Sequence, residues 1–297
     1  MSLAMKMTEW LVRRKPNVFV TEESFREALR RRGPEAPVPD ALKRSCDVRT
    51  ETVDGHEVIT LTPKSGATGT EVVYLHGGVY CRPMLSAHWR IVATLIQRTG
   101  ATFTVPLYGR APRYTVDDGY RFLDSVYRTV VQRAGDHPVL LAGDSCGGGF
   151  AVGQAIRCRD EGLRPPDGLL LFSPWLDVTM TNPGIAAVTE LDPMLAPAGF
   201  VAAGRYWADG RSVTDPLISP VYDTLKNLPP IYIYQGGHDI LLPDAEKFAA
   251  RARAAGTHVE LRVCPDAFHV FVGAGWIPEA RQALRDAADR IRSAVRK

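Results

Sequence analysis

The chain has 297 residues, of which 45% are hydrophobic and 23% are charged, and its formal net charge is +3. This length suits one large domain with a substantial core, and so small a basic excess argues against a nucleic-acid partner. The five cysteines lack metal-ligand spacing, no run is apolar over the length of a membrane span, and charges interrupt the N-terminus where a signal peptide needs an apolar core. We therefore expect a cytoplasmic protein in a reducing compartment.

The N-terminal segment predicts two helices followed by a hairpin. Residues 4–32 have the pattern of two short helices, the second beginning near Thr21. After a proline-rich linker, strands over 48–53 and 57–61 are expected to pair, because the Asp-Gly dipeptide at 54–55 favours a tight hairpin turn.

Strand and helix patterns then alternate to the end of the chain. The predicted strands are 71–75, 102–107, 139–142, 168–172, 231–234 and 259–263. The predicted helices are 86–98, 116–133, 147–160, 243–255 and 278–296. This alternation predicts an α/β fold, with a mostly parallel central sheet flanked by helices on both faces.

One interval breaks the alternation. Between Pro174 and Pro229 the spacing widens and prolines accumulate. We interpret this interval as an insertion over the carboxyl edge of the sheet, where open α/β sheets bind ligands.

The stretch LAGDSCGGGF, residues 141–150, has three interpretations. A Walker-type phosphate loop needs Lys-Ser or Lys-Thr after its last glycine, and Phe150 and Ala151 follow Gly149 instead. A dinucleotide fingerprint needs glycine or alanine at position 152, which is Val152. The third interpretation is a nucleophile elbow.

The elbow fits both the motif and its context. Gly143-Asp144-Ser145-Cys146-Gly147 is G-x-S-x-G between a predicted strand and a predicted helix. The turn leaves no room for side chains two residues before and after the serine, and its strained backbone exposes the hydroxyl. The motif also arises by chance, so Ser145 as nucleophile depends on finding a base and an acid.

Chain order selects the base and the acid, which in this arrangement follow the serine and come just after late strands. His269 follows the last predicted strand and is preferred over His238 and His258. Asp239 follows the strand at 231–234 and is the predicted acid. Asp244 is the alternative, although it falls in the first turn of a helix, where a carboxylate complements the helix dipole.

A serine hydrolase also needs backbone N–H donors aimed at the developing oxyanion. His76-Gly77-Gly78 directly follows a strand, and paired glycines let the backbone approach a ligand. We therefore predict that the amides of Gly77 and Gly78, with that of Cys146, form an oxyanion hole.

With these motifs in place, the chain resembles the hormone-sensitive-lipase-like (bacterial carboxylesterase) family of α/β-hydrolases. The resemblance extends from about residue 40 to the end and rests on HGGVY (76–80), GDSCGG (143–148), SPWLD (173–177), DPLISP (215–220), LPPIYIYQGGHDILLPD (228–244) and FHVF (268–271).

The resemblance implies the α/β-hydrolase fold, with a helical cap from about 1–38 and about 177–225 on a single domain spanning 1–297. It implies hydrolysis of short- to medium-chain acyl esters by Ser145, Asp239 and His269, with no cofactor or metal. It also implies that dimers are frequent.

The sequence departs from the family pattern in three places. Val79 stands where a third glycine is common, Cys146 replaces the usual alanine, and the block at 108–113 ends in arginine. A thiol at a helix N-terminus can be reactive, but Cys146 lies past the tip of the elbow, so we expect it to fill space. Residues predicted to line the substrate pocket are Tyr80, Met84, Met180, Met194 and Tyr206.

Together these features predict a serine carboxylesterase that acts on a small-molecule ester through an acyl-enzyme. Two alternatives stay open. A lactone, amide or carbamate hydrolase would use the same triad, since leaving-group preference depends on the cap. A non-catalytic binding protein of this fold would have no need of His269.

Overall fold

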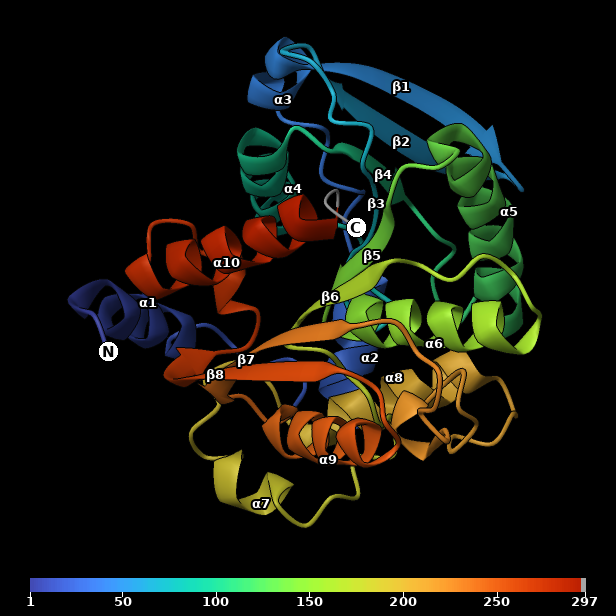
Figure 1. Ribbon diagram of the computed structural model, residues 1–297. Coiled ribbons are helices and arrows are strands. Elements are labelled where there is room, and N and C mark those ends of the chain that lie inside the picture. The colour runs from blue at the N-terminus through green and yellow to red at the C-terminus, as the bar shows by residue number, and fades with distance from the viewer. Residues whose placement is uncertain (295–297) are drawn as a thin grey trace.

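The computed structural model describes residues 1–294, and its centre is one eight-stranded sheet in the order β1-β2-β4-β3-β5-β6-β7-β8 (Figure 1). The strands are β1 (Cys46–Val53), β2 (His56–Pro63), β3 (Glu71–Leu75), β4 (Thr102–Pro106), β5 (Val139–Asp144), β6 (Gly168–Phe172), β7 (Ile231–His238) and β8 (Val259–Phe268). Strands β3 to β8 run parallel, whereas β2 pairs antiparallel with both β1 and β4. The predicted α/β architecture with a mostly parallel sheet is confirmed.

Helices cover both faces of the sheet. One face carries α4 (Ser86–Thr99) and α10 (Pro278–Ala294), and the other carries α5 (Val116–Ala134), α6 (Cys146–Asp160) and α9 (Leu242–Ala254) (Figure 1). Strands β3, β5 and β6 are buried along their whole length because helices pack on both sides, so their sequences are nearly continuous apolar runs.

The remaining helices come from the N-terminus and from the insertion. They are α1 (Leu3–Arg13), α2 (Glu22–Arg30), α3 (Asp40–Ser45), α7 (Ile185–Val188) and α8 (Pro197–Ala208), with 3₁₀ turns at Pro220–Tyr222 and Phe271–Gly273. Thr21 caps α2, accepting a hydrogen bond from the Ser24 amide at 3.0 Å. Helix α2 packs against α8, so the N-terminal segment and the insertion meet.

Most predicted elements are confirmed within two residues, and the hairpin turn has positive φ at both Asp54 (46°) and Gly55 (81°), as a tight primed turn requires. Strands β7 and β8 extend four and five residues beyond their predicted ends at 234 and 263. Helices α3, α7 and α8 were not predicted individually. Positions 295–296 of the last predicted helix lie outside the described residues.

None of the helices within residues 1–294 has the length and apolar character needed to cross a membrane.

Candidate active site

Ser145 occupies the turn between β5 and α6 with φ 52° and ψ −124°, a backbone conformation that side chains rarely adopt. Its amide donates to the Phe172 carbonyl at 3.0 Å, and its carbonyl accepts from the Trp175 amide at 2.8 Å.

The glycines on either side of Ser145 are required for steric reasons. A Cβ on Gly143 would collide with the Gly147 backbone, and one on Gly147 would collide with the Leu75 carbonyl. The turn therefore has the steric character predicted for a nucleophile elbow.

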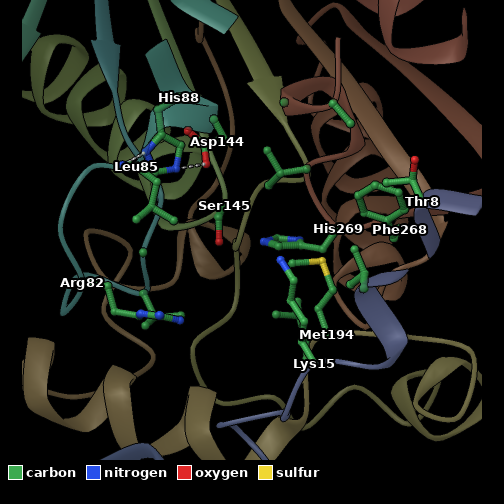
Figure 2. Close-up of a pocket in the computed structure, with 18 of the residues that line it drawn as sticks. Thr8, Lys15, Arg82, Leu85, His88, Asp144, Ser145, Met194, Phe268 and His269 are labelled. Atoms are coloured by element: carbon green, nitrogen blue, oxygen red, sulfur yellow. Dashed lines mark hydrogen bonds and ion pairs between the residues drawn. The ribbon is translucent and has the colours of Figure 1, made fainter. Parts of the chain in front are cut away.

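His269 and Asp239 form a buried pair at the carboxyl ends of β8 and β7. His269 Nδ1 lies 2.9 Å from Asp239 Oδ2, and Asp239 also accepts from Gln235 Nε2 at 2.8 Å and from the Leu241 amide at 3.0 Å. Because Nδ1 is paired with Asp239, Nε2 is the ring nitrogen of His269 that can exchange a proton with a group in the cavity. Figure 2 shows the imidazole and the Ser145 hydroxyl facing the same space, and both residues line one cavity.

Nearby carboxylates raise the pKa of His269 above its usual value of 6.5. Burial alone would lower this pKa, but the charge and hydrogen bond of Asp239 oppose burial, and the charges of Asp192 and Asp144 add to the increase. The pair thus favours the imidazolium that forms when a histidine accepts a proton from a serine.

The alternative base and acid lie elsewhere. His238 Nδ1 is 3.2 Å from Glu9 Oε1 and so faces the N-terminal helix. Asp244 Oδ1 accepts a hydrogen bond of 2.8 Å from Asn182. The side chain of His258 is mostly exposed and faces Glu260. None of the three predicted alternatives, His238, His258 and Asp244, lines the cavity with Ser145.

The predicted oxyanion donors require one correction. The amide of Gly77 donates to Asp144 Oδ1 at 3.1 Å and is therefore not free for a substrate oxygen. Position 77 requires glycine for a steric reason instead, because a Cβ there would collide with the Asp144 carboxylate and approach Ser145 Cβ at 3.0 Å. Within residues 1–294, the amides of Gly78, Val79 and Cys146 have no acceptor.

Asp144, to which the sequence assigned no chemistry, is the polar anchor of this loop. Its carboxylate accepts from the Tyr74 hydroxyl at 2.6 Å and from Gly77, and it lies 3.4 Å from His88 Nε2. Burial raises its pKa, but the charge and hydrogen bond of His88 and the hydrogen bond of Tyr74 outweigh burial, and the net shift is downward. Asp144 therefore stays ionised and fixes residues 77–79, here called the oxyanion segment, against the elbow.

The cavity has a volume of about 480 Å³ and is formed by three parts of the chain. The N-terminal segment contributes Thr8, Leu11, Val12, Lys15 and Phe19. The insertion contributes Met194, Leu195 and Phe200. The elbow and the loops that follow strands contribute Gly78, Val79, Arg82, Ser145 and His269. The insertion thus lies over the carboxyl edge of the sheet, as predicted, and the N-terminal segment joins it there.

Of the five predicted pocket residues, only Met194 lines this cavity. Tyr80 is buried and stacks on Trp207 with ring centroids 4.3 Å apart. Met84 and Met180 are buried in the two cores, and the hydroxyl of Tyr206 accepts from Arg26 at 3.3 Å. The predictions for Tyr80, Met84, Met180 and Tyr206 are therefore wrong: the first three side chains are buried in the cores, and the partly exposed side chain of Tyr206 lies outside the cavity.

Cys146 has the space-filling environment expected from its position past the elbow. Its Sγ accepts a hydrogen bond of 3.1 Å from the Tyr80 amide, and the side chain is fully buried. Burial raises the pKa of this thiol to about 12. The thiol is therefore protonated at neutral pH and turned away from the cavity.

Three further residues position the site and were missed from the sequence. Gln235 holds Asp239, Ser173 Oγ accepts from the Val270 amide at 3.0 Å beside His269, and Asp192 accepts from the Ile240 amide at 2.9 Å. Gln235 and Ser173 stand inside the quoted motifs QGGHD and SPWLD, which could have indicated them. Asp192 lies in the insertion, and only folding brings it to the loop after β7 that contains Asp239, here called the acid loop.

Comparison with known proteins gives concordant matches. A model of the Abhydrolase_3 family, described as an alpha/beta hydrolase fold, matches residues 72–273. The chain is 29% identical over 246 residues to an esterase of Acinetobacter venetianus, covering 82% of this chain and 80% of that protein. It is 32% identical over 247 residues to esterase LipU of Mycobacterium tuberculosis, covering 77% and 80%. Among solved structures, EstE5 soaked with p-nitrophenyl butyrate is similar over 100% of both chains, with a TM-score of 0.87 and 26% identity.

Proposed function

The chain belongs to the Abhydrolase_3 family of the alpha/beta hydrolase fold, and from this premise we propose that it is a carboxylesterase in which Ser145 is the nucleophile, His269 the base and Asp239 the orienting acid. The family resemblance drawn from the sequence motifs is confirmed by this membership. One observation carries the proposal: His269 Nδ1 lies 2.9 Å from Asp239 Oδ2 in a buried pair, and His269 lines the same cavity as Ser145.

The first half of the reaction acylates the enzyme. Ser145 Oγ attacks the ester carbonyl while His269 takes its proton, and Asp239 stabilises the imidazolium. The carbonyl oxygen becomes an oxyanion, for which the unbonded amides of Gly78, Val79 and Cys146 are the proposed donors. The tetrahedral intermediate collapses, and the alcohol leaves with the proton from His269.

The second half frees the enzyme. His269 takes a proton from water, the hydroxide attacks the acyl carbon, and the second intermediate expels Ser145 Oγ, which recovers its proton from His269. The strained backbone of Ser145 keeps its hydroxyl exposed to the cavity during both halves.

We propose that the N-terminal segment 1–38 and the insertion 177–225 form a cap that selects the substrate. Both segments contribute side chains to the wall of the cavity opposite the elbow, mainly apolar ones such as Leu11, Phe19 and Phe200. A cavity of about 480 Å³ fits acyl chains of short to medium length.

Hydrolysis of p-nitrophenyl esters from acetate to palmitate tests this function, with wild type compared against Ser145→Ala. We expect turnover to peak at short or medium chains and to fall by at least about 10⁴-fold in the variant, since the triad acts as a unit. Ser65→Ala, an exposed serine remote from the cavity, is the matched control and should retain activity.

Two outcomes would contradict the proposal. Full activity in Ser145→Ala would exclude Ser145 as the nucleophile. A folded wild type that hydrolyses none of the esters would favour a binding protein of the same fold.

A further inference from the structure

Two cationic side chains point into the cavity that holds Ser145 and His269. Lys15 follows helix α1, whereas Arg82 follows the oxyanion segment, so the two belong to separate parts of the chain. Figure 2 shows Arg82 on one side of the space below the Ser145 hydroxyl and Lys15 extending toward His269 on the other. Neither side chain has a hydrogen-bond or ion-pair partner among residues 1–294.

The other charged side chains of the cavity have partners within the protein, although Arg90 has no carboxylate among them. Arg90 Nε donates to the Gly273 carbonyl at 2.9 Å, and its guanidinium lies over the Trp276 ring. The Asp144 carboxylate is held by Tyr74, Gly77 and His88. Among the described residues that line the cavity, Lys15 and Arg82 are therefore the two cations without any hydrogen-bond or ion-pair partner, and the one carboxylate, that of Asp144, already has partners.

Arg82 differs from other partly buried arginines of this chain. Arg133 forms a two-pronged ion pair with Glu71, and Arg159 forms one with Asp223. Burial lowers the pKa of Arg82, and no carboxylate opposes this effect. Removing a charge from water without a counter-charge costs free energy, so an anionic ligand beside the Arg82 guanidinium would be stabilising. The folded chain supplies no carboxylate there.

We propose that the substrate is an ester carrying a carboxylate, which binds between Arg82 and Lys15 while the ester carbonyl lies at Ser145. This inference rests on the proposed esterase function. The planar fork of Arg82 matches the two carboxylate oxygens, and Lys15 adds a mobile second charge. Apolar residues, among them Leu11, Val12, Phe19 and Phe200, contact the hydrocarbon between the two ends of the substrate.

Two pairs of esters test the proposal and locate the carboxylate. In the first pair, 4-acetoxybenzoate is compared with its methyl ester, which places the charge on the alcohol side. In the second, the 4-nitrophenyl hemiester of succinate is compared with its methyl ester, which places the charge on the acyl side. We expect kcat/KM to favour the anion by about tenfold or more in at least one pair, because charge-assisted hydrogen bonds have this strength.

The variants Arg82→Gln and Lys15→Gln should each reduce this preference toward one. The preference should also decline with added salt, as for other partly exposed charge pairs. Arg98→Gln and Lys6→Gln are matched controls, because both cations are exposed and lie outside the cavity, and they should retain the full preference. Equal kcat/KM for anionic and neutral esters in wild type would overturn the proposal, as would an unchanged preference in Arg82→Gln.

Binding separates this proposal from the proposed function. Calorimetric titration of Ser145→Ala with the same four esters measures affinity where turnover is blocked. Tighter binding of the anionic member of a pair, lost in the double variant Ser145→Ala/Arg82→Gln, would support the carboxylate site even if no ester were hydrolysed. Equal affinities within both pairs would overturn the site while leaving the esterase reaction intact.

Discussion

The carboxylate of Asp192 accepts a hydrogen bond of 2.9 Å from the backbone amide of Ile240, the residue after the proposed triad acid. Its other oxygen accepts from the amides of Met194 and Leu195 at 2.8 and 2.9 Å, and both of those residues line the cavity. One buried side chain of the insertion thus fixes the acid loop and the substrate wall together. Burial, and next the charge of Asp239, raise the pKa of Asp192 to about 6.

This arrangement predicts the pH dependence of activity. His269 must be neutral to act as a base, and its pKa lies above 6.5, so kcat/KM should rise with pH through a midpoint above 6.5. The Asp192→Asn variant removes a negative charge that stabilises the imidazolium, which lowers the pKa of His269. The midpoint should therefore move to lower pH, as measured from kcat/KM between pH 5 and 9.

The control for this shift is Asp136→Asn, an exposed carboxylate outside the cavity, which should leave the midpoint unchanged. A midpoint that stays constant or rises in Asp192→Asn would mean that the charge of Asp192 does not act on His269.

The triad acid can be distinguished from its alternative by two amide substitutions. Asp239→Asn should lower kcat by about 10⁴-fold, because the amide no longer selects the ring tautomer in which His269 can accept the serine proton. Asp244→Asn should change kcat only a few-fold, since Asp244 bonds Asn182 and lies outside the cavity. Steady-state kinetics on p-nitrophenyl butyrate measures both, and the reverse ranking would overturn the assignment of Asp239.

Gly77 is predicted to be intolerant of even one methyl group. In Gly77→Ala the new Cβ collides with the Asp144 carboxylate and crowds Ser145, so the free energy of unfolding should fall by about 1–3 kcal/mol. Activity should fall as well, because the oxyanion segment must move. Urea denaturation and esterase assays check this, with Gly33→Ala, which has open space around it, as the control expected to match wild type.

The buried Cys146 thiol should resist alkylation. Burial raises its pKa to about 12, so almost none is thiolate at pH 8. Iodoacetamide at that pH should leave the activity of the native protein intact, whereas all five cysteines should react in urea. Mass spectrometry identifies the labelled positions. Rapid inactivation that coincides with labelling of Cys146 would show that this thiol is accessible in the native protein, against the prediction.

The sheet and the residues of the proposed triad could be predicted from the sequence because their signals are local. Strands β3 and β6 appear as apolar runs with the predicted bounds, and G-x-S-x-G already specifies a turn too tight for side chains around Ser145. His269 and Asp239 could be selected because parallel strands bring their carboxyl ends to one edge of a sheet.

The cavity lining was predicted poorly because its signals are not local. An aromatic or sulfur-bearing residue near the site in sequence can pack inward as easily as it lines a pocket, and Tyr80 and Met84 pack inward. Gly77 was assigned a free amide, but the assignment failed because the neighbouring carboxylate of Asp144 accepts that hydrogen bond.

The sequence by itself determined the order of strands and helices, the elbow at Ser145 and the identity of its proposed base and acid, because each follows from a short local pattern and from its place after a predicted strand. Only the tertiary structure decided which amides are free, which side chains line the cavity, and that Asp192, Lys15 and Arg82 gather around the site. Those properties depend on contacts between segments far apart in sequence. Which group accepts a hydrogen bond, fills a space or neutralises a charge is decided only when folding brings these segments together.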